Sequence, residues 1–573
     1  MNNNRQIGSI AGGLFPKTLL LAFVLSLCTT VRGAIRTVTS TADILAAGTL
    51  RFEINSAAAN DTINFDAALA GQTITLNLGE LQITRNLVIG GPGPTNLAIV
   101  NNNGRVFHVL GGPLNAVISG LQLTGHLKGN NGGDGTLGSV NGGDGESVTG
   151  GCIQNEEHCE LTVLNCFFTA CQAIGGYGGN GYTNVLYGFV SHGGLGGSAC
   201  GGAIFNNGGD LLLYHSTFAN NFSDGGKGGN GYYGGRGGNG GDGMGGAVCL
   251  GYGNHNMLVV NCTFHANTAS GGFGGNAGDA WINQIGAANG GDGGQGGNAQ
   301  GGAVHFGFES ACPAPDCTGV VHCTINKNEI RPGTGKPGGV GINGGLTGAG
   351  GLNGRAEGGG IYHYPDPRHV PVQNTIVAGN FATFTFTLGN IDYRGPDVFG
   401  SVASAGYNFI GIKDAYSSGW SAVLDFTGST LLPLDPLLGP LQNNGGETLT
   451  LAPLSCSPVI DKGSVGGFNL DQILQIRPVG ITAAPYLADG SDIGALELQT
   501  FPTTAPALVI TLSVNQVIIR WPVAFNCFVL QENPGLLATN WVNSANAVTI
   551  VGNQCQVIVS PPTGNRFYRL FHQ

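Results

Sequence analysis

The sequence is short of charge and of aromatic side chains. Only 10% of its 573 residues are Asp, Glu, Lys or Arg and 8% are aromatic, although 41% are hydrophobic and 105 are glycine. Helical or disordered chains of this length usually carry far more charge, so the composition argues against both classes. Abundant Gly, Asn and Thr with scattered β-branched residues are instead typical of an all-β solenoid.

Basic clusters and long apolar segments are missing beyond the N-terminus. The formal net charge is −11, so no basic face offsets repulsion by phosphate groups and we expect no nucleic-acid partner. No later segment is apolar for long enough to cross a bilayer. We therefore expect a mature chain without a transmembrane span, and a monomer.

The first residues have the pattern of a signal peptide. Basic residues precede the apolar run Leu19–Leu27, and the small residues Gly33 and Ala34 follow it. This order predicts a signal peptide over residues 1–34 and export to the extracellular space or the outer cell surface.

The chain contains 14 cysteines, and export would place them in a compartment that permits disulfides. Cys312 and Cys317, in the motif CPAPDC, are close enough in sequence to close a tight loop. Cys527 and Cys555 are the only cysteines near the C-terminus, which makes them a second candidate pair. No Cys/His spacing resembles a zinc site.

An internal repeat of variable length dominates the middle of the chain. Five segments open alike: GGCI at Gly150, GGAI at Gly201, GGAV at Gly245, GGAV at Gly301 and GGGI at Gly358. Each is followed by a second matching segment: LTVLNCFFTAC from Leu161, LLLYHSTFANN from Leu211, MLVVNCTFHAN from Met257, TGVVHCTINKN from Thr318 and VPVQNTIVAGN from Val370. Constant strands with loops of varying length indicate a solenoid whose insertions leave at one corner.

A column of polar residues runs through the second match: Asn165, His215, Asn261, His322 and Asn374. The apolar alternation shifts by one residue there, which predicts a corner between two strands. Stacked polar side chains can hydrogen-bond along such a corner as a structural ladder. Three short strands per coil give a right-handed parallel β-helix over residues 35–500.

Glycine-rich loops leave each coil with a period of three, mostly Gly-Gly-X, as in residues 225–246. Two interpretations stay open. Extended threefold chains can pack side by side through backbone hydrogen bonds, or the loops can be flexible, solvated linkers. Aromatic residues in the loops favour packing or an adhesive surface: Tyr177, Tyr182, Tyr232, Tyr233, Phe273 and Trp281.

One of these loops contains a calcium-binding pattern. GGNGGDGMG from Gly237 matches the nonapeptide G-G-x-G-x-D-x-U-x, and GGNAGDAWI from Gly274 differs by one substitution. Asp242 and Asp279 are therefore candidate calcium ligands. Calcium-binding arrays need tandem copies, whereas these are single copies in separate loops.

The motifs also resemble known families. GGA[IV] followed by Phe-x-x-Asn, at 218–221 and 264–267, resembles the repeats of chlamydial polymorphic outer-membrane proteins, and GTLRFEI from Gly48 resembles the N-terminal cap of bacterial proteins with that β-helix. QNNGGETLTLAPLSCSPVIDKG and the later DIGALE are similar to the choice-of-anchor type Q family, although its Asp-Gln-Arg-Gly-x-x-Arg-Pro motif is only partial here. The resemblance implies a surface or secreted β-helix with adhesion as its main theme and no shared catalytic residues.

The pattern changes after a linker at residues 501–506. Short runs in residues 507–573 alternate apolar and polar residues, for example QVIIRWPV and CQVIVS. This alternation predicts a small antiparallel β-sandwich.

The main functional hypothesis is a non-enzymatic, secreted or cell-surface β-helix for adhesion or glycan binding, with extracellular polysaccharide or cell-surface glycans as partners. The alternative is a polysaccharide lyase or glycoside hydrolase on the same fold. Such enzymes need carboxylates clustered on adjacent coils, whereas here the acidic residues fall in turns and glycine loops. Two carboxylates facing each other across coils in a groove would favour the enzyme; a flat face dotted with aromatic residues would favour binding.

Overall fold

The computed structural model describes residues 33–183, 189–251, 256–282, 286–307, 319–364, 369–384, 393–421, 423–481, 488–500, 506–525, 527–535, 540–562 and 564–572. Nearly all of the predicted signal peptide, the Cys312 and Cys317 pair and most of the predicted linker lie outside the described residues. No helix in the described part is long and apolar enough to cross a membrane.

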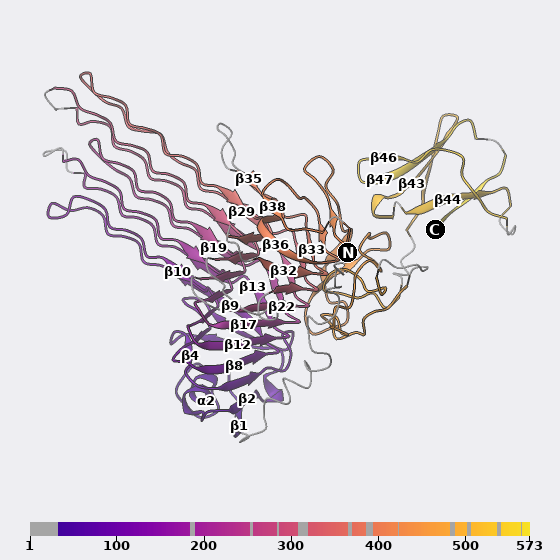
Figure 1. Ribbon diagram of the computed structural model, residues 1–573, viewed down its shortest axis with the longest axis horizontal. Coiled ribbons are helices and arrows are strands. Elements are labelled where there is room, and N and C mark those ends of the chain that lie inside the picture. Colours follow the sequence, from indigo (N-terminus) through magenta and orange to yellow (C-terminus); the bar gives the residue numbers. More distant parts are fainter. Residues whose placement is uncertain are drawn as a thin grey trace, which may run out of the picture.

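The described chain is almost entirely β-structure, and most of it is a solenoid of parallel strands (Figure 1). Its helical elements are α2 (Leu50–Ser56) and the short 3₁₀ turns at Ala67–Leu69 and Val523–Phe525. Successive coils contribute short strands to two long parallel faces, and the coils from β10 (Val148–Thr149) onward also to a third, which agrees with the all-β solenoid expected from the composition.

The first face consists of two parallel ladders that share strand β36. One ladder contains β4 (Leu81–Ile83), β7 (Phe107–Val109), β11 (Ile153–Asn155), β16 (Ile204–Asn206), β21 (Val248–Leu250), β26 (Val304–Phe306), β31 (Ile361–His363) and β36 (Val398–Gly406). The other contains β1 (Ile35–Val38), β2 (Asp61–Phe65), β5 (Leu87–Gly90), β8 (Leu114–Ser119), β12 (Cys159–Leu164), β17 (Asp210–Tyr214), β22 (Met257–Val260), β27 (Gly319–Val321), β32 (Val370–Gln373) and β36, with β38 (Ser417–Ser418) beyond it.

The second face contains β3 (Gln72–Leu76), β6 (Leu97–Asn101), β9 (Gln122–Lys128), β13 (Phe167–Thr169), β18 (Thr217–Ala219), β23 (Thr263–His265), β28 (Thr324–Asn326), β33 (Ile376–Ala378), β37 (Phe409–Ile410) and β39 (Phe426–Thr427). It continues through β14 (Gln172–Ile174), β19 (Phe222–Asp224), β24 (Thr268–Ser270), β29 (Glu329–Arg331) and β34 (Phe381–Ala382). The third face contains β10 (Val148–Thr149), β15 (Ala199–Cys200), β20 (Gly243–Met244), β25 (Ala299–Gln300), β30 (Ala356–Glu357) and β35 (Tyr393–Arg394).

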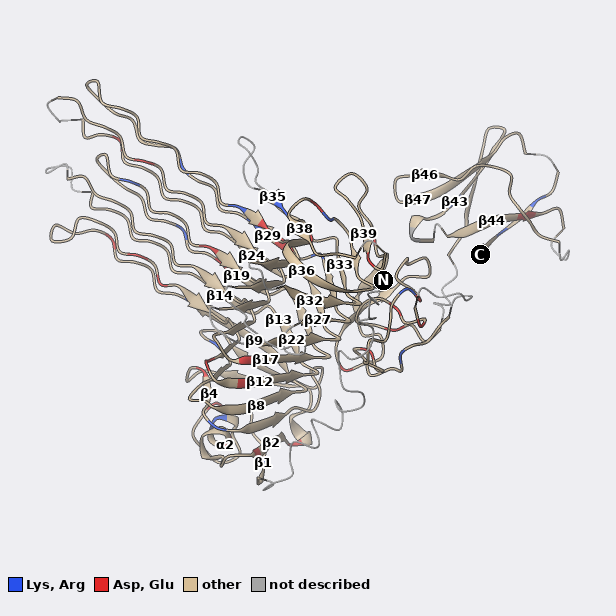
Figure 2. Cartoon of the chain, in the orientation of Figure 1, with Lys and Arg blue, Asp and Glu red and all other residues tan. Residues whose placement is uncertain are grey.

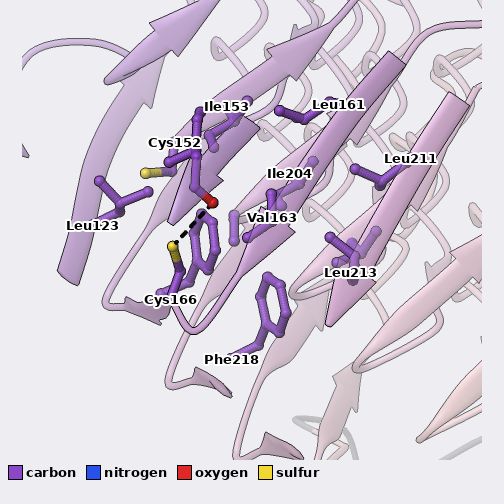
Figure 3. Close-up of a cluster of buried hydrophobic side chains, with 14 of the residues drawn as sticks. Leu123, Cys152, Ile153, Leu161, Val163, Cys166, Ile204, Leu211, Leu213 and Phe218 are labelled. Atoms are coloured by element: carbon purple, nitrogen blue, oxygen red, sulfur yellow. Dashed lines mark hydrogen bonds between the residues drawn. The ribbon is translucent and has the colours of Figure 1, made fainter. Parts of the chain in front are cut away.

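The core forms because equivalent apolar side chains stack in register from coil to coil. Ile153 pairs with Ile204, and the rings of Phe168 and Phe218 stack with their centroids 4.7 Å apart. Figure 3 shows Ile153, Ile204 and Phe218 among the buried side chains of this core. Helix α2 begins after its N-cap Thr49 and buries Leu50 and Ile54 in the same core, which covers the strand edge at the N-terminal end.

The predicted polar column lies at a turn. All five of its residues have positive φ, between 50° and 51°, a conformation that Asn tolerates better than most residues. Its side chains do not form a continuous ladder. Among its described side-chain contacts, His322 Nδ1 accepts from Asn374 Nδ2 at 2.7 Å, while Asn261 Nδ2 donates to Leu470 O at 2.9 Å.

Leu470 belongs to a segment that folds back over this corner. We call residues 443–498 the strap. Within it, Leu449 O accepts from Thr217 Oγ1, and Gln472 Oε1 accepts from Thr263 Oγ1, both at 2.6 Å. The corner column is therefore covered by the chain's own C-terminal half.

A second column forms the continuous ladder. Its members are Asn221, Asn267, Asn328, Asn380 and Asp397, and each side-chain amide donates to the side-chain oxygen of the next at 2.8 Å. All five are buried. The ladder satisfies amides that would otherwise be buried without partners.

The C-terminal region contains two antiparallel sheets. One contains β42 (Val509–Ser513), β43 (Gln516–Pro522), β46 (Thr549–Val551) and β47 (Gln554–Val559); the other contains β44 (Phe528–Asn533), β45 (Val542–Asn543) and β48 (Phe567–His572). A further antiparallel pair, β40 (Leu438–Gln442) and β41 (Thr450–Pro453), lies before them at the start of the strap.

The predicted pairing of Cys527 with Cys555 is wrong. Cys527 forms a disulfide with Cys456 of the strap, whereas Cys555 is unpaired and buried. The reason is strand geometry: Cys555 on β47 points into a core with Trp521 and Leu530, while Cys527 lies just before β44 and faces the strap. A second disulfide, Cys200–Cys249, joins neighbouring coils.

Candidate functional site: a plate of glycine-rich hairpins

Five glycine-rich hairpins leave the solenoid at the same corner and project from it side by side (Figure 1). They comprise residues 129–147, 175–198, 225–242, 271–298 and 332–355, each lying between a strand of the second face and one of the third. We call their described residues the glycine plate, and number its layers 1 to 5 in chain order. Each layer has an outgoing leg and an inbound leg.

Successive backbone amides in the plate donate to different neighbouring chains. In layer 3, Gly228 N donates to Phe273 O in layer 4 at 2.9 Å. The next amide, Gly229 N, donates to Gly194 O on the inbound leg of layer 2, also at 2.9 Å. A threefold extended chain directs its amides outward about 120° apart and makes no internal hydrogen bonds. Of the two interpretations left open by the sequence, the plate therefore has the ordered, hydrogen-bonded one.

Glycine is required in the plate because the chains approach each other closely. A Cβ on Gly229 would lie 1.9 Å from Gly179 O, and one on Gly275 would lie 1.8 Å from Gly229 O. Neither distance can be tolerated without moving a backbone. At Gly133, the equivalent position in layer 1, a Cβ would meet no atom within 4 Å. Glycine is therefore required where one layer stacks on another.

The third residue of each triplet caps its neighbour in the next layer. Asp134 Oδ1 accepts from Asn180 N at 2.7 Å, and Asn180 Oδ1 accepts from Asn230 N at 3.0 Å. The inbound leg repeats this arrangement through Ser147, Ser198, Asp242, Asn298 and Arg355. Short side chains with an oxygen acceptor suit these positions because they bind the one amide that the glycine pairs leave free.

In layer 5, several third positions lack a side-chain oxygen that could accept a hydrogen bond. Its third positions include Pro337, Val340, Leu346 and Leu352 in place of Asn, Asp or Ser, and the two leucines are each 73% exposed. No further Gly-Gly-X hairpin follows in the sequence, so no amide above layer 5 needs an acceptor. The composition of the last hairpin thus marks the end of the stack.

A ladder of alternating cations and aromatic rings crosses the outgoing face. Its members are Lys128, at the end of β9 just before layer 1, and then Tyr177, Lys227, Phe273 and Lys336 in layers 2 to 5. The lysine Nζ atoms lie 5.3, 5.7, 5.6 and 5.8 Å from the adjoining ring centroids, within cation–π range. None of the three lysines forms an ion pair with another described residue. Charged residues are sparse along the hairpins (Figure 2).

The two predicted calcium ligands lie in different columns of the plate. Asp242 Oδ1 accepts from Asn298 N at 2.6 Å, and Asp279 Oδ1 accepts from Val340 N at 2.7 Å. Burial raises the pKa of Asp242. The described residues contain no group of three or more His, Cys, Asp or Glu side chains placed to hold a metal ion. The local role of both carboxylates is to cap the next layer.

Two carboxylates do face each other across coils, but an imidazole lies between them. Glu80 contacts His108 Nδ1 at 2.8 Å and Glu156 contacts His108 Nε2 at 3.0 Å. The hydrogen bond from His108, aided by Arg105, lowers the pKa of Glu80 to about 2. A general acid needs a raised pKa, so this cluster acts as an ion-pair brace between coils.

The polar corner column is not accessible as a binding surface. His322 is buried beneath the strap, where Val465 O lies 3.0 Å from its Nε2. Because a carbonyl only accepts, Nε2 carries the proton and Nδ1 accepts from Asn374. Burial and the nearby Arg477 lower the pKa of His322 well below its ordinary value, so the ring is neutral.

The sequence reasoning noted Tyr177 and Phe273 but missed the three lysines. Lys128 ends strand β9 just before layer 1, Lys227 occupies the third position of a triplet in layer 3, and Lys336 replaces a glycine of layer 5. Aligning the hairpins by their Gly-Gly-X period brings Tyr177, Lys227 and Phe273 into one column. Only the spatial stacking brings Lys128 and Lys336 to its ends.

Comparison with known proteins gives no family: no protein-family model matches the chain, and no curated protein matches it significantly.

Proposed function

We propose that this is an exported, non-enzymatic β-helix protein of the extracellular space or cell surface, and that the glycine plate is its binding surface for glycans. The plate supports this proposal because its ordered, close-packed backbone holds the side chains of the ladder in fixed positions. Binding to a preorganised surface avoids the entropic cost of ordering a flexible loop.

The observation that carries the proposal is the ladder on the outgoing face. It runs across the hydrogen-bonded layers of the plate, and its Tyr177 is 39% exposed. Aromatic rings provide apolar area for a sugar face without needing a deep pocket. The alternative, a polysaccharide-active enzyme, has less support, because the paired carboxylates Glu80 and Glu156 are held by His108 and both have lowered pKa values.

Two finer features of the fold belong to the same proposal. The solenoid is right-handed, as parallel crossover connections almost always are. The two C-terminal sheets pack face to face as a sandwich, which is supported by a shared core of Trp521 from one sheet and Leu530 from the other. The motifs for the chlamydial-type repeats and choice-of-anchor type Q proteins support the placement of the chain among such β-helix proteins.

A glycan array combined with lyase and hydrolase assays tests the function. The mature protein is expected to retain one or more polysaccharides without releasing oligosaccharides or unsaturated sugars. Deleting residues 225–242 together with the stacked hairpin 271–298 is expected to abolish retention. Released product, or unchanged retention by a folded deletion variant, contradicts the proposal.

A further inference from the structure

The positive charges of the ladder recur at every second step from one chain to the next. Lys128 ends the strand that leads into layer 1, Lys227 and Lys336 lie in layers 3 and 5, and the aromatic rings occupy layers 2 and 4. Hydrogen-bonded neighbouring chains lie about 4.8 Å apart, so the three ammonium groups recur at about 10 Å. A ligand that contacts all three must be long, extended and charged at intervals rather than continuously.

The ladder contributes little to stability compared with the plate's backbone hydrogen bonds. Exposed cation–π contacts add little to stability, whereas the interior of every layer is held by backbone hydrogen bonds to its neighbours. The side chains of Lys128, Tyr177 and Lys227 are exposed and those of Phe273 and Lys336 are half-buried, and the lysines lack described carboxylate partners. Their ammonium groups are therefore available to an anion from solution.

Charge also distinguishes between classes of polyanion. The protein carries a net charge of −11 and the ladder supplies only three cations, so a densely charged polyphosphate is repelled overall. A polymer with sparse charges avoids most of this repulsion. Its uncharged units can then contact the parts of the Tyr177 and Phe273 rings that the flanking lysines leave uncovered, where they bury apolar surface.

Resting on the function proposed above, we propose that Lys128, Tyr177, Lys227, Phe273 and Lys336 bind an acidic polysaccharide that carries a carboxylate on every second sugar. The lysines pair with successive carboxylates, and the two rings contact the neutral sugars between them. The ligand lies across the layers, parallel to the direction in which the hairpins stack.

Four immobilised or titrated probes test this: hyaluronan, which has a carboxylate on alternate sugars; polygalacturonate, which has one on every sugar; neutral dextran; and oligo(dT). Hyaluronan is expected to bind most tightly, and its binding to weaken as salt screens the exposed charges. Preference for oligo(dT), or equal binding of dextran and hyaluronan, overturns the proposal.

The variant Lys128→Gln/Lys227→Gln/Lys336→Gln is expected to weaken hyaluronan binding by about two- to fivefold per lysine. The double variant Tyr177→Ala/Phe273→Ala is expected to weaken it while leaving most of the salt dependence. Arg236→Gln is the matched control, since its side chain lies on the inbound leg of layer 3, beside Asp292, and binding should not change.

The outcomes also separate this inference from the broader function. If glycans are retained by the plate but the triple lysine variant binds as the wild type does, the ladder is not the site although the plate remains a glycan-binding surface. If no glycan is retained by any form of the protein, both proposals fail. Circular dichroism and protease resistance confirm that each variant is folded.

Discussion

The side-chain amide of Asn221 donates a hydrogen bond to the side-chain oxygen of Asn267 in the coil above, at 2.8 Å. The same oxygen accepts from Asn221 N at 3.1 Å, so one carbonyl satisfies two buried donors. Repeated up to Asp397, this contact ties each coil to the next at a position where the chain turns and the sheet hydrogen bonds are interrupted.

Asn267→Ala is expected to lower the free energy of unfolding by roughly 2–5 kcal/mol. The substitution leaves two donors of Asn221 without an acceptor and removes the donor to Asn328, and each unsatisfied buried group costs about 1–3 kcal/mol. Denaturant unfolding measures the loss. Asn276→Ala is the control, because its column neighbour in layer 5 is Pro337, which has no N–H to bind; a similar loss there would contradict the ladder's role.

Gly229→Ala is expected to separate the layers of the plate without unfolding the solenoid. The added methyl group would lie 1.9 Å from Gly179 O, so the outgoing legs of layers 2 and 3 must move apart and lose their shared hydrogen bonds. Hydrogen exchange of the plate amides and limited proteolysis report this. The matched substitution Gly133→Ala, with open space around its Cβ, should behave as the wild type.

The carboxyl group of Asp397 is expected to make stability depend on pH. Burial raises its pKa to about 7 against its hydrogen bonds from Asn380 and Ile412. Because the folded-state pKa exceeds the unfolded value near 4, this group's contribution is fully present below about pH 4 and is lost as pH rises through 7.

Asp397→Asn removes that titration but turns an amide group toward Ile412 N, which costs about 1–3 kcal/mol. The variant is therefore expected to be less stable than wild type at pH 5, with the difference shrinking by pH 8. Unfolding midpoints across this range measure it. For Asp134→Asn on the exposed plate, the difference in stability from wild type should not shrink between pH 5 and pH 8. If the difference for Asp397→Asn instead grows with pH, the raised pKa of Asp397 is contradicted.

The disulfide between Cys456 and Cys527 is expected to tie the C-terminal sheets to the strap. With a protease site engineered after Pro506, the cleaved protein should run as one species on a denaturing gel until it is reduced. Cys456→Ser should release the C-terminal fragment without reductant, while Cys555→Ser should not. Release of the C-terminal fragment from the cleaved wild type without reductant would contradict the Cys456–Cys527 disulfide and favour the pairing of Cys527 with Cys555 predicted from the sequence.

The sequence by itself determined the solenoid and its corners. Three local patterns predicted them: apolar residues with a period of two, the shift of that alternation at Asn165 and its equivalents, and the repeated GGA[IV] openings. Each pattern reflects a backbone requirement within a single coil. The antiparallel character of the C-terminal strands was predictable for the same reason.

Tertiary structure decided everything that depends on which coils and segments meet. The strap covers the corner column through contacts between residues more than 100 positions apart, such as Asn261 with Leu470. The spacing of residues in the sequence does not predict such contacts. The pairing of Cys527 with Cys456 was hidden in the same way. The sequence alone allowed the glycine loops to be either solvated or stacked, because a threefold extended chain makes no internal hydrogen bonds that would hold its shape. Hydrogen bonds to acceptors in the neighbouring layers decide for the stacked form.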